Sequence, residues 1–244
     1  GYAEGEGWTP IGKYNDYTEV PFSGTYDGGG FQITGLTINR PLWYQGLFGV
    51  ARNAVIQNVH IVDCSIAGAA NTGALIGVTY ASIFGCSASG KVTGTMDTVG
   101  GIVGYCGGKI GSSFSTCDVN GKRLAGGIAG LASMDGSVEN CWSSGSVSAS
   151  EDSAGGIAGG NSNDAVVKYC YSTVSVSAPT YAGGIVGQAQ SQVEYCAALN
   201  PSVTGGTNHV ATVNATYGGS ISNCYAWDGM KLGGTTADIP EGVT

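Results

Sequence analysis

Cysteine is the residue of this chain whose spacing is most informative about chemistry. Two thiols in a CxxC arrangement would bind zinc or exchange disulfides, and no two cysteines here have that spacing. A disulfide scaffold is not expected either, because 244 residues can bury a core without covalent staples. The cysteines therefore predict neither a metal site nor a redox motif, and their regular gaps need a structural explanation. They occupy positions 64, 86, 106, 117, 141, 170, 196 and 224.

Charged side chains recur three residues before successive glycine pairs, as Asp97, Arg123 and Asp152. They would form either an exposed ion-pair ladder, worth about 0–1 kcal/mol per contact, or the paired carboxylates of a polysaccharide-cleaving enzyme. The two acids, two coils apart, would lie roughly 9–10 Å from each other, at or beyond the upper end for an inverting glycosidase. Arg123 between them would keep both carboxylates ionised, whereas the reaction needs one protonated. We therefore expect no catalytic residues.

Three aromatic residues, Phe114, Trp142 and Tyr171, occupy equivalent positions in successive repeats, each directly after a position that is mostly cysteine. If that position points inward, alternation along a strand turns the aromatic residue outward. Rings one strand apart could stack against a sugar or an apolar protein surface, or they could form a cross-strand ladder that only stabilises the sheet. Both interpretations stay open, and Phe114, Trp142 and Tyr171 are the candidate binding residues.

A repeat of 26–29 residues relates these positions to one another. Most copies contain two glycines, two apolar residues and a third glycine, as in residues 126–130 (GGIAG). After each glycine motif comes another position that recurs once per repeat and is mostly cysteine; we call this set of positions the second register. A β-branched aliphatic residue stands three positions before every member of it. Short β-branched segments broken by glycine exclude helical repeats and predict a solenoid. The second register is Val59, Cys86, Ser113, Cys141, Cys170, Cys196 and Cys224; the aliphatic ladder is Ile56, Ile83, Ile110, Val138, Val167, Val193 and Ile221.

The pattern predicts an all-β fold: a single-stranded parallel β-helix with three sides per coil, about seven coils and an N-terminal cap. Each residue of the aliphatic ladder should be almost free of solvent. The glycines of the repeat should allow positive φ at corners and close approach of neighbouring coils. The register cysteines should be buried, reduced thiols, because strands about 4.8 Å apart exceed the Cβ separation of a disulfide. Cys64, Cys106 and Cys117 lie off the register, and a Cys106–Cys117 disulfide is left open.

Composition divides the chain into three parts. Residues 1–45 concentrate aromatic residues and proline and are expected to form the N-terminal cap and leader strands; 46–226 form the β-helix, and 227–244 a C-terminal tail or linker. Nine Lys and Arg in a chain of net charge −8 offer no basic stripe for nucleic acid. No apolar run reaches 18 residues and the N-terminus lacks a signal-peptide pattern, so neither membrane insertion nor a signal or anchor is expected within this sequence.

Residues 46–49 (GLFG) match the core of the GLUG motif, and segments 8–12, 22–28 and 33–38 resemble the usual opening of proteins that carry it. With six in-phase copies of the glycine motif, about residues 8–226 resemble the GLUG-motif repeat family of bacterial secreted and cell-surface proteins. Some members are non-catalytic parts of immunoglobulin A-cleaving metallopeptidases, whose catalytic motif is a helical HExxH. Because His60 and His209 lie in no such setting, the resemblance implies an extracellular or cell-surface location without peptidase activity.

These observations predict a non-enzymatic module of a secreted or cell-surface bacterial protein, adhesin-like, that binds a glycan or a host surface protein. Two alternatives stay open: a structural spacer that presents another domain, and a polysaccharide-cleaving β-helix enzyme. No cofactor or metal ion is expected. Nucleic acid is not an expected partner, and the chain is expected to be a monomeric module of a larger protein.

Overall fold

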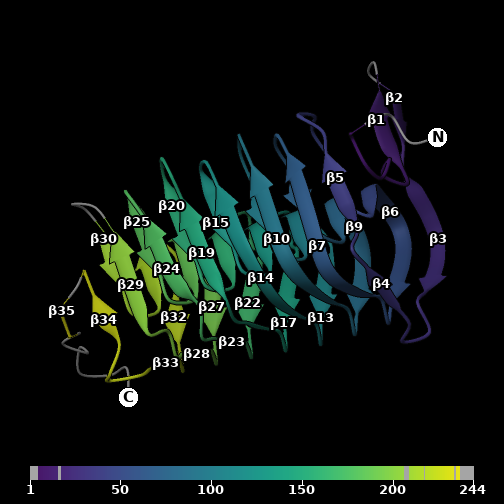
Figure 1. The fold of residues 1–244 in the computed structure, drawn as a ribbon. Coiled ribbons are helices and arrows are strands. Elements are labelled where there is room, and N and C mark those ends of the chain that lie inside the picture. Colours follow the sequence, from purple (N-terminus) through teal and green to yellow (C-terminus); the bar gives the residue numbers. More distant parts are fainter. Residues whose placement is uncertain (1–4, 16–17, 206–208, 217, 234, 237–244) are drawn as a thin grey trace.

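The computed structural model describes residues 5–15, 18–205, 209–216, 218–233 and 235–236, and every regular element in them is a β-strand (Figure 1). The chain winds into a solenoid whose coils stack from β3 (Phe22–Asp27) at one end to β34 (Lys231–Leu232) at the other. Strands of successive coils pair in parallel and form three sheets that run the length of the stack. The predicted parallel β-helix of about seven coils is confirmed.

Two of the three sheets are long. Within the described residues, sheet 1 contains β4 (Gln32–Thr34), β5 (Thr37–Asn39), β7 (His60–Gly68), β10 (Ser87–Gly94), β14 (Phe114–Gly121), β18 (Trp142–Ser143), β19 (Ser146–Ala149), β23 (Tyr171–Ser172), β24 (Ser175–Ala178), β28 (Ala197–Ala198), β29 (Ser202–Gly205), β33 (Tyr225–Ala226), β34 and β35 (Thr235–Thr236). Sheet 2 contains β3, β6 (Phe48–Gln57), β9 (Ile76–Phe84), β12 (Val103–Cys106), β13 (Lys109–Gly111), β16 (Ala129–Ala132), β17 (Ser137–Glu139), β21 (Ala158–Asn161), β22 (Val166–Lys168), β26 (Val186–Ala189), β27 (Gln192–Glu194), β31 (Asn214–Thr216) and β32 (Ile221–Ser222).

Sheet 3 is narrower and consists, in the same residues, of β8 (Thr72–Gly73), β11 (Val99–Gly100), β15 (Leu124–Gly126), β20 (Ser153–Gly155), β25 (Tyr181–Gly183) and β30 (His209–Ala211). Antiparallel pairing occurs at the two ends, between β1 (Lys13–Asn15) and β2 (Thr18–Val20) and between β34 and β35. Because β3, β4 and β5 pair with β6 and β7, residues 22–39 supply the first strands of the two long sheets. In the described residues no helix has the length and apolar character needed to cross a lipid bilayer.

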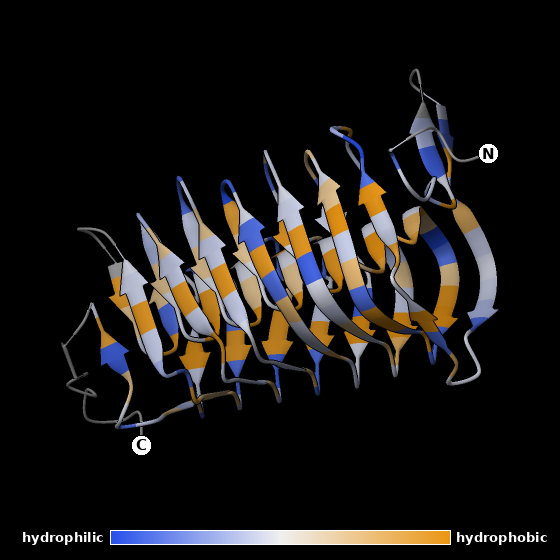
Figure 2. Ribbon diagram, viewed as in Figure 1, coloured by the Kyte–Doolittle hydropathy of each residue, from blue (hydrophilic) through white to orange (hydrophobic). Residues whose placement is uncertain are grey.

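The aliphatic ladder has the predicted register, because each of its seven members pairs with the next across sheet 2. Six members are 0% exposed, and hydrophobic bands recur at matching positions of successive strands in Figure 2. For Ile221 the prediction of burial is wrong, since 40% of this residue is exposed. Among the described strands, β32 pairs with β27 on one side only, so none of them covers Ile221 on its other side.

The glycines divide the two predicted roles: the paired glycines permit close approach between backbones, whereas positive φ occurs at other glycines, such as Gly85 and Gly145. A Cβ at Gly127 would lie 2.1 Å from the carbonyl oxygen of Gly156 on the next coil, and neither glycine has a positive φ. Left-handed backbone occurs instead directly before the second register, with φ between 50° and 60° in every coil. These corner residues are Asn58, Gly85, Ser112, Asn140, Tyr169, Tyr195 and Asn223.

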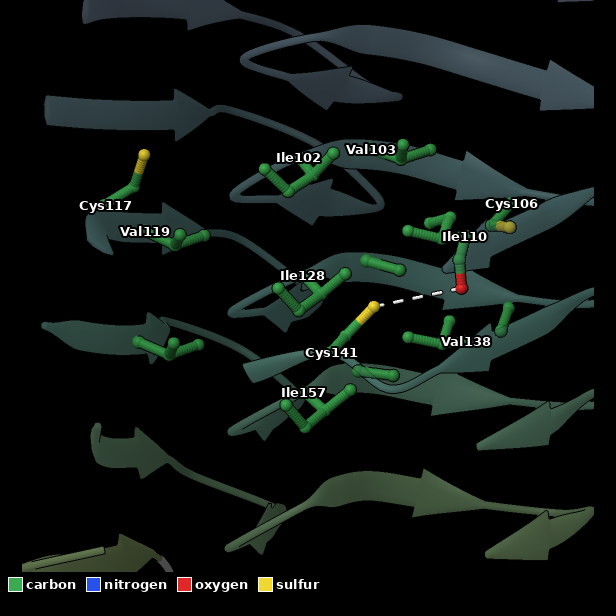
Figure 3. Close-up of a cluster of buried hydrophobic side chains, with 14 of the residues drawn as sticks. Ile102, Val103, Cys106, Ile110, Cys117, Val119, Ile128, Val138, Cys141 and Ile157 are labelled. Carbon is green, nitrogen blue, oxygen red and sulfur yellow. Dashed lines mark hydrogen bonds between the residues drawn. The ribbon is translucent and has the colours of Figure 1, made fainter. Parts of the chain in front are cut away.

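All eight cysteines are buried. Cys141 illustrates the register. Its thiol lies 3.2 Å from the carbonyl oxygen of Glu139. It also lies 3.8 Å from the carbonyl oxygen of Ile110 on the preceding coil, the contact drawn in Figure 3. The other four register cysteines make the equivalent pair of contacts. Burial disfavours the thiolate and raises the pKa of Cys86 to about 11 and that of Cys106 to about 12. These thiols pack as small apolar side chains with weak donors.

The disulfide left open between Cys106 and Cys117 does not form. Cys106 ends a strand of sheet 2 and Cys117 lies on sheet 1, at opposite sides of the core in Figure 3. Their sulfurs contact different carbonyls, those of Gly108 at 3.4 Å and Gly101 at 3.9 Å, and both are free thiols. Nearness in sequence therefore does not bring these two thiols together, because they lie on different sheets.

Aromatic residues of the N-terminal segment cover the first coil. The Phe48 side chain is fully buried, and its ring lies 4.9 Å from that of Phe22 and 5.4 Å from that of Tyr26. The indole N–H of Trp8 donates to the carbonyl oxygen of Leu47 at 3.1 Å. These contacts shield the apolar interior at the N-terminal end of the stack.

Candidate functional site

The candidate binding residues form one row across sheet 1. Phe114 pairs with Trp142, and Trp142 pairs with Tyr171. Their rings are stacked, with centroids 4.5 Å and 5.8 Å apart and planes within 5° of each other. This geometry is that of a cross-strand ladder, and it covers both faces of Trp142. Phe114 and Trp142 are half-buried, whereas Tyr171 is 41% exposed. The face of Tyr171 opposite Trp142 is the part of the stack available to a planar or ring-shaped ligand.

The row continues beyond the predicted residues in both directions. Before the stack, His60 pairs with Ser87, and its Nδ1 lies 2.8 Å from the Ser87 hydroxyl, a local contact at the start of β7. After the stack, Tyr171 pairs with Ala197, and Ala197 pairs with Tyr225, which is 55% exposed. A methyl group therefore separates two tyrosines on the last three coils. The side chain of His209 lies outside the described residues.

A second aromatic pair was not predicted from the sequence. Tyr169 and Tyr195 are corner residues, and their rings stack 5.2 Å apart at 21°, each about half exposed. Both have left-handed backbone, with φ of 56° and 51°, which costs a bulky L-residue roughly 1–2 kcal/mol. The other coils use Asn, Gly or Ser at this corner, residues that adopt this backbone more easily. Two bulky rings at a strained, exposed corner mark the position as a candidate functional site.

These tyrosines belong to a larger exposed apolar surface, here called the C-terminal aromatic face. It consists of Tyr169, Tyr171, Tyr195, Leu199, Tyr225 and Trp227. Each member is between 41% and 55% exposed, and all come from the last three coils. Exposed apolar patches of this kind are typical of binding surfaces. The signal in the sequence was available, because each tyrosine of the face directly precedes or follows a register cysteine.

Asp97, Arg123 and Asp152, here called the charged row, lie at the corner between sheets 1 and 3. Arg123 Nε lies 3.1 Å from an oxygen of Asp97, and both side chains are about half exposed, so one rung of the expected ion-pair ladder is present. Partial burial raises the pKa of Asp152, and Arg123 opposes this shift. A groove of about 410 Å³ runs beside these residues and is also lined by Trp43 and Gln188. Within the described residues, no cluster of three or more His, Cys, Asp or Glu side chains could hold a metal ion.

Comparison with known proteins gives matches to a motif, a sequence and a structure. Residues 151–177 match the family model of the GLUG motif. Over 102 residues the chain is 36% identical to halomucin of Haloquadratum walsbyi; this stretch is 41% of the chain but 1% of halomucin. The crystal structure of a Bacteroides ovatus protein, provisionally named as an immunoglobulin A1 protease, superposes with a TM-score of 0.62 at 22% identity. The superposition covers 97% of this chain and 69% of that protein, and it shows a shared fold. The resemblance to GLUG-motif repeats is confirmed.

Proposed function

We propose that this chain is a non-catalytic binding module of a secreted or cell-surface protein, and that it holds a glycan or a protein partner on the C-terminal aromatic face. The GLUG motif and the β-helix fold fit a surface module. The observation that carries the binding function is the concentration of exposed rings on the last three coils, two of them at strained corners. Predicted binding residue Tyr171 lies within this face, and Phe114 and Trp142 support it from behind as a stack.

Absence of catalysis is part of the proposal. Asp97 is ion-paired with Arg123, whereas partial burial raises the pKa of Asp152 and the Arg123 charge opposes that rise. A glycosidase needs one carboxylic acid that is protonated at working pH beside one that is ionised. Asp97 and Asp152 lie two coils apart, about 9.5 Å, at or beyond the upper end for an inverting glycosidase, and Arg123 stands between them. This spacing supports surface ion pairing better than catalysis, and the C-terminal aromatic face has no acidic member.

A multivalent glycan array combined with a screen of immobilised surface proteins tests the proposal. The variant Tyr171→Ala/Tyr195→Asn removes two rings from the face, and Asn suits the left-handed corner at 195. Each ring should contribute on the order of 1 kcal/mol, so the double variant should bind the best hit about thirtyfold more weakly. Phe84→Ala is the matched control, because Phe84 is an exposed aromatic residue on sheet 2, outside the face.

Equal binding by the double variant and the parent protein would remove the face as a binding site. Loss of binding in Phe84→Ala to the same extent would show that exposed rings act without regard to position, which also contradicts the proposal. If the parent protein binds nothing in either screen, the chain is better described as a spacer that presents another domain.

A further inference from the structure

One position interrupts the aromatic row of sheet 1. Phe114, Trp142 and Tyr171 are stacked, and the next position in the row is Ala197, followed by Tyr225. Because Trp142 on the preceding coil stacks on one face of Tyr171, the other face of that ring is turned toward the coil of Ala197. Tyr225, the most exposed member of the C-terminal aromatic face, stands on the far side of Ala197. We call the space between the two tyrosines, with Ala197 as its floor, the Ala197 gap.

The width of the gap follows from the sheet. Tyr171 and Tyr225 are two strand spacings apart, and strands lie about 4.8 Å from each other, so the two side chains leave the sheet about 9.5 Å apart. A flat aromatic ring between them would need only about 7–8 Å, two carbon–carbon contacts of about 3.5–4.0 Å. A pyranose ring is thicker, because it is puckered and carries axial hydrogens on both faces. The spacing favours a sugar ring over a nucleobase or an indole.

The surroundings of the gap suit the same ligand. Tyr195 and Leu199 lie two residues to either side of Ala197 on the same coil, and both are exposed, so apolar side chains border the floor. Trp227 lies two residues beyond Tyr225, and its amide donates to Ala198 at 2.9 Å, which keeps it in the same sheet. The C–H faces of a pyranose pack against aromatic rings, while the tyrosine hydroxyls at the outer rim can exchange hydrogen bonds with sugar hydroxyls.

From this geometry we propose that the Ala197 gap is a subsite for one pyranose ring, sandwiched between Tyr171 and Tyr225. The inference rests on the proposed binding function and makes it specific, because it selects a glycan over a protein partner and places one sugar at a defined coil. Ser87 is also a small residue between two rings of the row, His60 and Phe114, but there the His60 ring contacts the Ser87 hydroxyl at 2.8 Å. Ala197 offers no such polar partner between Tyr171 and Tyr225.

The decisive variant is Ala197→Tyr, which fills the gap by extending the existing stack. Binding of methyl β-glucopyranoside, methyl β-galactopyranoside and methyl α-mannopyranoside is measured by saturation-transfer NMR, with indole as the planar probe. The parent protein should transfer saturation to the ring C–H protons of at least one pyranoside, and Ala197→Tyr should bind that pyranoside at least about tenfold more weakly. Phe84→Ala, which removes an exposed ring on sheet 2 outside the gap, is the control and should bind as the parent does.

A second variant covers the case in which a tyrosine at 197 disturbs folding. Tyr225→Ala removes one wall at a position that is 55% exposed, so it should leave the melting temperature nearly unchanged while weakening pyranoside binding about tenfold. Unchanged binding in Tyr225→Ala, or in a folded Ala197→Tyr, overturns the subsite. Binding of indole without binding of any pyranoside overturns it as well.

The outcomes separate this inference from the proposed function. If Tyr171→Ala/Tyr195→Asn loses binding on the array while Ala197→Tyr keeps it, the C-terminal aromatic face binds its partner but the gap is not the subsite. If the parent protein binds neither the array nor any pyranoside, both the function and the subsite are wrong.

Discussion

Replacing Val167 with Asp tests the solenoid interior directly. Val167 is 0% exposed and pairs with Val138 on one side and Val193 on the other, so the new carboxyl would be enclosed by three coils. Ile221 occupies the same register position in the last coil and is 40% exposed. Ile221→Asp is therefore a control with the same introduced group in the same row, differing in whether a further coil covers it.

The cost of Val167→Asp has two parts. Loss of two buried methyl groups costs about 1.6 kcal/mol, and a neutral carboxyl without hydrogen-bond partners costs about 1–3 kcal/mol more. Burial raises the pKa of the introduced carboxyl above its unfolded value of about 3.9, and each unit of that rise costs about 1.4 kcal/mol once the pH exceeds the folded pKa. The ionisation penalty is thus absent below about pH 4 and grows as the pH rises. At pH 7 we expect a total loss of about 6–8 kcal/mol if the folded pKa reaches about 7.

Urea denaturation followed by circular dichroism, at pH 7 and again near pH 4, measures both parts. The midpoint of Val167→Asp should fall far below that of the parent at pH 7 and recover part of the difference at pH 4. Ile221→Asp should stay within about 1 kcal/mol of the parent at both pH values. Equal midpoints for Val167→Asp and Ile221→Asp would refute the assignment of the buried ladder.

Three further predictions concern the thiols, the glycine pairs and the corners. A thiol reagent should leave the register cysteines, such as Cys141, unlabelled in the folded protein and label all eight cysteines after unfolding; labelling without denaturant would contradict their burial. Gly127→Ala should lower the free energy of unfolding by several kcal/mol, because its Cβ would lie 2.1 Å from a carbonyl oxygen. Gly160→Ala is the control and should cost less than about 1 kcal/mol, because the atoms nearest its Cβ are 3.3 Å away. Similar losses for the two variants in thermal melts would disprove the close-approach argument. Asn140→Ala should destabilise by about 1 kcal/mol and Asn140→Gly should not, since φ at this corner is 53°; the same melts decide, and equal effects would exclude a backbone cause.

Much of the fold could be predicted because the same pattern, a β-branched residue at a fixed position of a short strand, recurs in seven repeats. A β-branched residue three positions before the second register fixes which side chains stack, and the structure pairs all seven as expected. Burial of Ile221 could not be inferred from that register, since exposure depends on whether another coil follows. The Cys106–Cys117 bond was left open because a sequence gap of 11 residues does not reveal that a sheet boundary lies between them.

The candidate site was predicted in part. The row of Phe114, Trp142 and Tyr171 is where the register places it, but the mutual stacking of the rings, which covers the faces of Trp142, depends on side-chain torsions that a register does not specify. Tyr169 and Tyr195 directly precede register cysteines, so their positions could be read from the sequence, but their left-handed backbone and the stacking of their rings could not. Identifying them required the backbone conformation as well as the sequence.

The direction of the sheet hydrogen bonds determines how this chain responds to force. They run along the solenoid axis, and β3 and β34 lie at opposite ends of the stack (Figure 1). Tension between the ends would peel coils from the ends of the stack one after another. Each coil of 26–29 residues that unwinds lengthens the molecule by roughly 90 Å, at about 3.5 Å per residue. A ligand that bridges neighbouring coils would be lost when those coils unwind.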